Sequence, residues 1–431
     1  MIRTEKEAIA YIHEHGWKKT EPGLTRIEGL LRALGSPQDR LHFVHVAGTN
    51  GKGSVCAMLA RILREANYQT GLFISPYLVN FKERIQLNGR NISSADLIRY
   101  TDLVRTEAEK TNERYSEFEL ILAIGLCYYA DRGVQIVVLE TGLGGRLDPT
   151  NVIPKAELCV ITEVDMDHME ILGHTEEAIA REKAGIIKER CPVLYGGSKA
   201  NVLSVIRAAA DEKHAVLYEA DHQTLDQVSF DFDRTRIRLK DGREIGVGLK
   251  GPYQVDNVLT VLAAVQVLRQ TYKISDGALR RGFSNARWPG RFEFLSLNPP
   301  CIFDGGHNVQ GVTAAVEGFK TYFPGQKACI LTAVMADKDY RPMAEKLKEI
   351  AGPVVTVDFD NPRVLKADRY AETLRSVGLK AVSAESVLNG MQKALLISRE
   401  KHVPILIVGS LYFYAPVKKT IKEAIAVQPN R

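Results

Sequence analysis

The sequence of 431 residues has no run of about 18 apolar residues, which is the length that a membrane-spanning helix needs. It has only six cysteines and no CxxC pair, which excludes the usual spacing of zinc and redox motifs. The net charge is +5, and no stripe of Lys and Arg marks a nucleic-acid-binding surface. We therefore expect neither a membrane nor a nucleic acid as a partner.

Other common signals are also missing. There is no internal repeat and no low-complexity segment, and residues 1–6 are charged, without the apolar core of a signal peptide. A hydrophobic content of 45% and a charged content of 25% are typical of a globular protein. We expect a cytoplasmic protein with reduced, buried cysteines. Because each half of the chain has enough apolar residues for its own core, we also expect a monomer.

The most informative segment is the glycine-rich GTNGKGS at 48–54, which follows the apolar run 41–47 and precedes a helical pattern. A strand, a glycine loop and a helix in this order form a phosphate-binding loop, because backbone N–H groups and the helix N-terminus attract anions. Lys52 is expected to reach the terminal phosphates, and Ser54 to face a magnesium ion. The general motif has Ser or Thr directly after Lys, whereas Gly53 intervenes here.

The pattern around this loop predicts an α/β fold with a mostly parallel sheet. Continuous apolar runs at 135–139 and 158–161 are typical of strands buried on both faces. Residues 117–131 and 176–189 have helical patterns. In 227–249, apolar and polar residues alternate around an Asp-Gly turn, which predicts a small antiparallel insertion at the edge of this domain.

The pattern starts afresh after the Pro-Gly turn of Trp288–Arg291. Further strand candidates alternate with helical stretches, which predicts a second, Rossmann-like α/β domain of ordinary size. We divide the chain into an ATP-binding domain at 1–287, a linker at 288–299 and a C-terminal domain at 300–431.

Three polar residues follow predicted strands of the first domain. They are Ser75, Glu140 and His168. Ligands of parallel α/β sheets bind beyond the carboxyl ends of the strands, so these side chains are candidates for a magnesium site beside the loop. Magnesium keeps several waters and takes few protein ligands, so two or three contacts suffice. Each residue alone has an ordinary structural interpretation.

The second domain repeats this arrangement. Asp304 and His307 follow its first predicted strand, and Arg291 is suited to bidentate phosphate binding. Lys183 by itself looks like a solvated helix lysine. Together these residues predict that ATP is held where the two domains meet.

Taken together, these residues and their motifs resemble the folylpolyglutamate synthase family of the Mur ligase superfamily over nearly the whole length of the chain. The resemblance is carried by motifs in family order, the most specific being the third: HVAGTNGKGS at 45–54, SPYL at 75–78, ETGLGGRLDPTN at 140–151, EKAGI at 182–186, WPGR at 288–291 and GSLY at 409–412.

The resemblance implies an ATP-dependent ligase that adds L-glutamate to reduced folates, and many bacterial members of the family also join glutamate to dihydropteroate. It implies ATP contacts from Asn50, Gly51, Lys52, Gly53, Ser54, Asn257, Arg291 and Asp304. It implies one or two Mg²⁺ ions held by Ser75, Glu140, His168 and, if carbamylated, Lys183. It implies substrate contacts from Phe118, Glu119, Leu147, Asp148 and Pro149, with His307 and Ser410 receiving glutamate. Lys52, Lys183 and His307 are the expected catalytic residues.

Three departures from the family pattern stand at Gly306, Val309 and Glu163–Asp165. The extra carboxylates of the last are expected either to alter metal affinity or to be solvated. Alternative functions are a Mur-type ligase for another carboxylate, such as a peptidoglycan precursor, a nucleic-acid-stimulated NTPase, and a non-catalytic folate-binding protein. The NTPase would turn over ATP without an amide product and would be stimulated by DNA or RNA. A non-catalytic protein is disfavoured by the intact set of Lys52, Glu140, His168 and Lys183.

Overall fold

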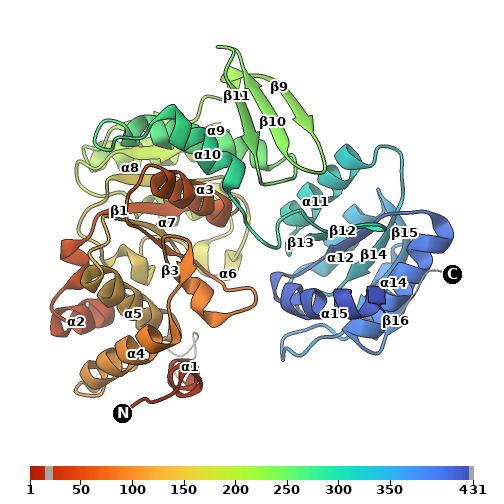
Figure 1. Cartoon of the computed structure of the whole chain (residues 1–431), viewed down its shortest axis with the longest axis horizontal. Coiled ribbons are helices and arrows are strands. Elements are labelled where there is room, and N and C mark those ends of the chain that lie inside the picture. The colour runs from red at the N-terminus through yellow and green to blue at the C-terminus, as the bar shows by residue number, and fades with distance from the viewer. Residues whose placement is uncertain (15–22, 427–431) are drawn as a thin grey trace. The chain divides into compact units, whose positions relative to one another are not determined.

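The computed structural model describes residues 1–14 and 23–426 and consists of two compact units (Figure 1). The first comprises Met1–Leu225 and Asp256–Arg287, and the second Asp226–Val255 and Trp288–Arg431. We predicted from the sequence that the antiparallel insertion lies at the edge of the first domain. In the structure it groups with the second unit instead. Its Phe232 ring contacts the rings of Phe294 and Tyr322, at centroid distances of 5.3 and 6.1 Å, and this aromatic packing explains the grouping.

The first unit contains an eight-stranded sheet. Strands β2, β5, β1, β6, β7 and β8 are parallel, and β3 and β4 form an antiparallel edge beside β2. Its central strands are buried along their whole length, as the continuous apolar runs predicted. In sheet order the strands are β4 (Arg90–Asn91), β3 (Ile85–Leu87), β2 (Thr70–Phe73), β5 (Ile136–Glu140), β1 (Phe43–Ala47), β6 (Leu158–Ile161), β7 (Val193–Tyr195) and β8 (Leu217–Glu219).

Helices flank this sheet, and α3 packs against both β5 and β2. The helices are α1 (Glu5–Glu14), α2 (Thr25–Ala33), α3 (Lys52–Glu65), α4 (Ser94–Ala108), α5 (Glu117–Asp131), α6 (Met169–Leu172), α7 (Glu176–Ala184), α8 (Ala200–Glu212), α9 (Gln254–Leu268) and α10 (Asp276–Asn285). Short 3₁₀ turns lie at Pro37–Arg40, Phe81–Arg84, Pro149–Val152 and His222–Thr224.

The helix predicted at 176–189 ends earlier, at Ala184. A Cβ atom on Gly185 would lie 2.5 Å from the Cα of Arg146, so the chain passes too close to continue with a larger residue. Ile186 and Ile187 then enter the core. Packing of the loop after β5 thus overrides the helical pattern of the sequence.

The second unit contains a six-stranded sheet, parallel except for its edge strand β12. That strand lies within the segment predicted as a linker, at Glu293–Leu297, where it pairs with β13. In sheet order the strands are β12 (Glu293–Leu297), β13 (Pro300–Asp304), β17 (Ile405–Val408), β14 (Ala328–Thr332), β15 (Ala351–Val357) and β16 (Ala381–Ala384). The helices are α11 (Val309–Tyr322), α12 (Tyr340–Leu347), α13 (Ala367–Ser376), α14 (Val387–Lys401) and α15 (Tyr414–Ala426), with a 3₁₀ turn at Leu411–Phe413.

The insertion is a three-stranded antiparallel sheet of β9 (Leu225–Phe230), β10 (Thr235–Leu239) and β11 (Glu244–Val247). Gly242 lies in the turn between the last two strands with φ of 85°, a conformation that favours glycine, so the predicted Asp-Gly turn is confirmed. The predicted fold class is confirmed as well: two α/β units, the first with a mostly parallel sheet, and a small antiparallel sheet.

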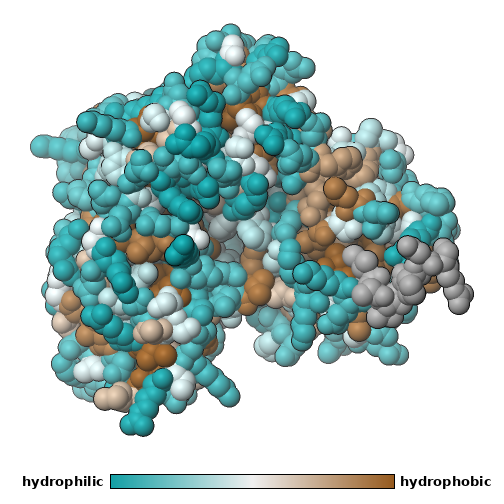
Figure 2. All heavy atoms as spheres, viewed as in Figure 1, coloured by the Kyte–Doolittle hydropathy of each residue, from teal (hydrophilic) through white to brown (hydrophobic). Residues whose placement is uncertain are grey.

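All six cysteines are free and buried, as predicted. Within the described residues no helix is both long and apolar enough to cross a membrane. On the face shown in Figure 2, hydrophilic residues predominate and hydrophobic residues lie scattered among them.

Candidate active site

The glycine-rich loop connects β1 to α3, as predicted. Gly48 and Gly51 have φ of 149° and 86°, which L-residues with a side chain rarely adopt. A Cβ on Gly48 would lie 1.8 Å from Thr162 Oγ1, and one on Gly51 would lie 2.3 Å from Asn257 Oδ1. Both positions therefore require glycine, and the structure brings Asn257 of α9 against the loop.

Helix α3 begins at Lys52, and its N-cap residue Gly51 supplies no side-chain hydrogen bond. The first N–H groups of a helix have no acceptor within the helix, and together with the helix dipole they attract anions. The Lys52 Nζ donates to the Gly48 carbonyl at 2.9 Å and to the Thr49 carbonyl at 3.2 Å. The loop thus holds the ammonium beside the helix N-terminus, a geometry suited to phosphate.

Lys183 is not a solvated lysine. It lies in α7 with only 3% of its surface exposed, and its Nζ donates to the same Gly48 carbonyl at 2.9 Å. Burial, and after it the nearby Lys52 charge, lowers the pKa of Lys183 to about 7. The structure therefore places a second amine, with a substantial neutral fraction at neutral pH, on the phosphate-binding loop.

Ser75 and Glu140 lie together, because β2 and β5 are neighbours in the sheet. The backbone N–H of Ser75 donates to Glu140 Oε2 at 3.0 Å, and Glu140 is buried at the carboxyl end of its strand. His168 is the N-cap residue of α6 and has a left-handed φ of 49°, and its side chain is 39% exposed beside Asp167. Its metal role stays a prediction.

The donors present fit a magnesium ion, which binds oxygen and takes few protein ligands. The described residues contain no group of three or more His, Cys, Asp and Glu that could hold a metal. A ligand set of the Glu140 carboxylate, a serine hydroxyl and waters is compatible with both observations, whereas a protein-only cage such as that of structural zinc is not.

Asp148, predicted to contact substrate, is fully engaged within the protein. Its Oδ2 accepts from the N–H groups of Gly142 and Leu143 at 2.9 and 2.7 Å, and its Oδ1 accepts from the N–H and hydroxyl of Thr150 at 3.0 and 2.5 Å. Burial raises the pKa of Asp148, and these hydrogen bonds oppose the rise. Asp148 thus fixes the loop after β5, and a substrate contact by it stays a prediction.

The residue that continues this network was not among the predicted site residues. His45 of β1 is fully buried, and its Nε2 lies 2.9 Å from Thr150 Oγ1. Because the Thr150 hydroxyl donates its proton to Asp148, His45 Nε2 must be the donor in this contact. Burial keeps the pKa of His45 well below its usual value, so the ring is neutral. A histidine inside an apolar strand pattern is the signal that marks such a partner.

The predicted substrate residues of α5 differ in their environment. Phe118 lies beside the exposed Gly142, where an added Cβ would come within 2.9 Å of its ring. Glu119 is buried and caps its own helix, accepting from the N–H and hydroxyl of Ser116 at 2.7 and 2.8 Å. Leu147 and Pro149 are half-buried on either side of Asp148. Phe118 is therefore better placed than Glu119 to meet a ligand.

In the second unit, Asp304 ends β13 as a buried carboxylate. It accepts from the Tyr253 hydroxyl at 2.7 Å and from the N–H groups of Phe292 and Gly306 at 3.0 and 2.8 Å. Burial raises the pKa of Asp304, and the charge of Arg291 opposes this most strongly. Asp304 thus fixes the turn that carries Arg291.

His307 and Ser410 also lie at this edge of the second sheet, since β13 and β17 are paired. The Nδ1 of His307 lies 3.1 Å from the Gly305 carbonyl, which accepts only from a protonated nitrogen. Ser410 is buried and caps the following 3₁₀ turn, where its Oγ accepts from the Tyr412 N–H at 3.2 Å. The structure brings these two loops together, since a Cβ on Gly305 would lie 2.1 Å from Leu411 Cδ2.

Two family models match the chain, and the first of them runs through the antiparallel insertion. Residues 46–265 match the Mur ligase middle domain, and residues 290–411 match the glutamate ligase domain of Mur ligases. The fold and the phosphate-binding loop therefore define a protein of the Mur ligase class. Within that class, the chain belongs to the folylpolyglutamate synthase/dihydrofolate synthase family.

The chain is 35% identical to the dihydrofolate synthase/folylpolyglutamate synthase of Bacillus subtilis, over 98% of this chain and 100% of the relative. It superposes on a Mycobacterium tuberculosis folylpolyglutamate synthase, solved with ADP and AMPPCP, with a TM-score of 0.87, 27% identity and coverage of 97% and 98% of the two chains. It also superposes on E. coli FolC in complex with DHPP and ADP, with a TM-score of 0.83, 27% identity and 98% coverage of both chains.

Proposed function

We propose that this protein is an ATP-dependent ligase that joins L-glutamate to a reduced folate through an acyl phosphate. The observation that carries the proposal is the pair of lysines on the Gly48 carbonyl of the phosphate-binding loop. The family of the chain and the ADP complexes of its structural relatives support a nucleotide as the ligand of this loop.

The chemistry requires activation of a carboxylate, because a carboxylate is a poor electrophile. Its oxygen attacks the γ-phosphorus of ATP, ADP leaves, and the resulting acyl phosphate is attacked by the α-amino group of glutamate with release of phosphate. Lys52 would neutralise charge on the transferring group, and the N–H groups of Gly51, Gly53 and Ser54 would hold the phosphates. Asn50 and Asn257 would complete the contacts of the first unit.

Magnesium bound by Ser75, Glu140 and His168 would supply further charge neutralisation on the phosphates. The carboxylate of Glu140 is the strongest donor in this set, and its hydrogen bond from Ser75 orients it. Phe118, Glu119, Leu147, Asp148 and Pro149 are the proposed surroundings of the pterin.

We further propose that Lys183 is carbamylated. Its neutral amine would attack CO₂, forming the N–C bond of a carbamate and releasing one proton. Two ammonium groups that share one carbonyl repel each other, whereas a carbamate beside Lys52 would be attracted to it and would offer oxygen donors to a second ion. ¹³C NMR of protein equilibrated with ¹³CO₂ tests this, with Lys183→Ala as the control that abolishes the carbamate signal.

In the second unit, we propose that Arg291 and Asp304 contact ATP and that His307 and Ser410 receive glutamate. A nucleophilic amine must be neutral, and His307 would orient it or accept its proton. The hydrogen bond between Nδ1 and Gly305 supports this role because it fixes the proton on that nitrogen.

The test uses purified protein with ATP, Mg²⁺ and L-glutamate, plus tetrahydrofolate or dihydropteroate. We expect ADP release that depends on glutamate and a product heavier by one glutamyl residue. A peptidoglycan precursor serves as the control acceptor and is expected to give no product. If neither pterin supports glutamate-dependent ADP release, the proposed function is wrong.

Dihydropteroate is a second candidate acceptor, because the Bacillus subtilis relative is named for both activities and the E. coli structure contains DHPP. The same assay with each acceptor in turn distinguishes a bifunctional from a monofunctional enzyme. A cytoplasmic location and a monomeric state remain predictions.

A further inference from the structure

The loop after β6 and the phosphate-binding loop are joined along the edge of the first sheet, where β1 and β6 are neighbours. The backbone N–H of Thr49 donates to the Glu163 carbonyl at 2.8 Å, and the Thr162 hydroxyl donates to the Asn50 carbonyl at 2.7 Å. The first half of the phosphate-binding loop is therefore anchored to the neighbouring loop, while its second half opens α3.

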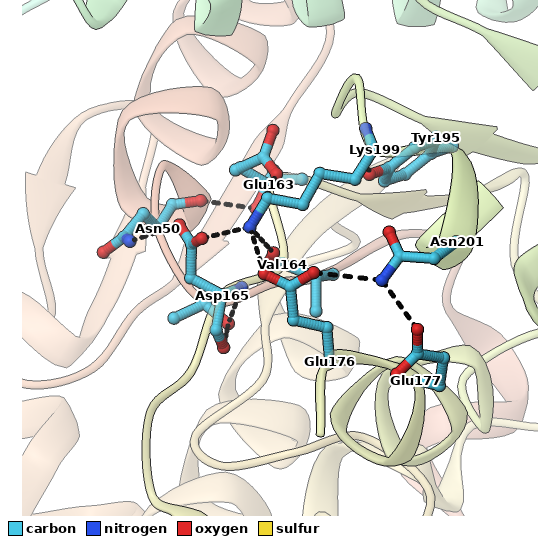
Figure 3. A network of polar contacts seen from close by, with 11 residues as sticks. Asn50, Glu163, Val164, Asp165, Glu176, Glu177, Tyr195, Lys199 and Asn201 are labelled. Carbon is cyan, nitrogen blue, oxygen red and sulfur yellow. Dashed lines mark hydrogen bonds and ion pairs between the residues drawn. The ribbon is translucent and has the colours of Figure 1, made fainter. Parts of the chain in front are cut away.

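Asp165 is the centre of this attachment (Figure 3). Its N–H donates to Thr49 Oγ1 at 3.0 Å, and that hydroxyl donates to the Asp165 carbonyl, also at 3.0 Å. The Asn50 side-chain amide donates to Asp165 Oδ2 at 3.4 Å. The acidic segment Glu163–Asp165, whose carboxylates we expected either to alter metal affinity or to be solvated, thus contacts the phosphate-binding loop directly.

Lys199, the N-cap residue of α8, reaches this carboxylate from outside the loop (Figure 3). Its ammonium donates to Asp165 Oδ1, to the Val164 carbonyl at 2.9 Å and to Glu176 Oε1 at 2.6 Å. It also lies 3.8 Å from Glu163 Oε1. One cation therefore serves three carboxylates.

The two oxygens of Asp165 have different partners, and this gives Lys199 a role. The ammonium occupies Oδ1 and leaves Oδ2 directed at Asn50. Without the ammonium, the carboxylates of Glu163, Asp165 and Glu176 would repel one another at short range. Asp165 would turn or move, and the Asn50 side chain would lose its support.

We propose that Lys199 is a positioning residue for nucleotide binding that acts through Asp165 on Thr49 and Asn50. The inference rests on the proposed function only in taking ATP as the ligand of the loop. Lys199 stabilises the loop in its binding conformation before the nucleotide arrives, which lowers the ordering cost of binding.

The test measures the affinity of the full-length protein for ADP with Mg²⁺ by calorimetry, together with the KM values for ATP and glutamate. Lys199→Met is expected to weaken ADP binding about tenfold, as loss of a charged hydrogen bond does. The KM for ATP rises in parallel, while the KM for glutamate stays close to that of the wild type. Lys199→Arg, which keeps a cation, is expected to restore part of the affinity.

Two further variants sharpen the interpretation. Adding Glu163→Gln to Lys199→Met removes one repelling charge and is expected to recover part of the ADP affinity. Asn201→Ala is the matched control, because Asn201 contacts Glu176 and Glu177 at 3.0 and 2.7 Å on the far side of the network. This control is expected to leave ADP affinity unchanged.

Wild-type ADP affinity in Lys199→Met, or a loss no larger than that of Asn201→Ala, would overturn the proposal. If Lys199→Met does not fold, Asp165→Asn gives the same test, since it keeps the side-chain shape and removes the charge that Lys199 binds. Wild-type ADP affinity in Asp165→Asn also overturns the proposal. A wild-type protein that binds ADP but forms no amide contradicts the proposed function alone.

Discussion

The ammonium groups of Lys52 and Lys183 donate to the same carbonyl oxygen, that of Gly48, each at 2.9 Å. Lys52 is half-buried at the start of α3, whereas Lys183 is almost completely buried in α7. Burial, and after it the repulsion from the Lys52 charge, lowers the pKa of Lys183. The pair is therefore matched to an anion, and both the phosphates of a nucleotide and a carbamate on Lys183 meet that requirement.

Replacing Lys52 by Ala should abolish turnover without unfolding the protein. The Lys52 ammonium donates hydrogen bonds to two carbonyls of the loop, and alanine is a good helix former. Loss of one preorganised charge on a transferring group costs about 10²–10³ in rate, and we expect at least this reduction in glutamate-dependent ADP release.

Lys82→Ala is the matched control for this prediction, because Lys82 contacts Glu5 and Ser94 away from the loop. It should retain wild-type turnover. Near-full activity in Lys52→Ala would show that the loop is not the phosphate site, and a lowered urea midpoint would attribute the loss to unfolding.

Much of this site follows from the sequence, because it depends on local patterns. The order of strand, glycine loop and helix places Lys52, and the polar residues after β2 and β5 place Ser75 beside Glu140 since parallel strands end at one edge. The carboxyl edge of the second sheet, with Asp304 and His307, follows in the same way.

What the sequence could not predict depends on contacts between distant segments. The burial of Lys183 is set by packing of α7 on the loop, and the helix pattern alone suggested a solvated charge. The four donors around Asp148 come from a turn and a loop whose geometry has no sequence period. Lys199 lies far from the phosphate-binding loop along the chain, and nothing in its own segment points there.

The lowered pKa of Lys183 predicts how stability depends on pH. In the folded state this amine deprotonates at about pH 7, whereas in the unfolded state it stays protonated to about pH 10.4. Between these values the unfolded state binds more protons, so stability rises with pH, by up to about 1.4 kcal/mol per unit for this group. Urea unfolding in CO₂-free buffer at about pH 7.5 and about pH 9 measures the slope.

Lys183→Met is the reference for that experiment, since it removes the titrating group and keeps an apolar chain of similar length. The difference in unfolding free energy between wild type and variant should shift in favour of the wild type as the pH rises. A difference that is constant with pH would mean that the Lys183 amine is not perturbed in the folded protein.

Thr150→Val should destabilise the first unit and disturb the loop after β5. The hydroxyl donates to Asp148 and accepts from His45, so its loss leaves two buried polar groups without this partner. An unsatisfied buried group costs about 1–3 kcal/mol, and we expect a loss of this size in urea unfolding. Thr106→Val, which removes an exposed hydroxyl bonded to the Asp102 carbonyl, should change stability much less. Equal effects of the two substitutions would contradict the network.

The contact between α10 and α3 gives a test of packing within one helix. A Cβ on Gly282 would lie 2.7 Å from the Cα of Ile62 in α3, and backbone cannot yield as a side chain can. Gly282→Ala should therefore force the helices apart and cost about 1–3 kcal/mol. In the same helix, a Cβ on Gly277 would meet the flexible end of Arg281 at 3.3 Å and Ser275 Oγ at an ordinary contact distance of 3.7 Å. Because alanine is the better helix former by about 1 kcal/mol, Gly277→Ala should be neutral or stabilising. Urea unfolding of both variants measures this, and a Gly282→Ala protein as stable as Gly277→Ala would show that α3 and α10 do not pack this closely.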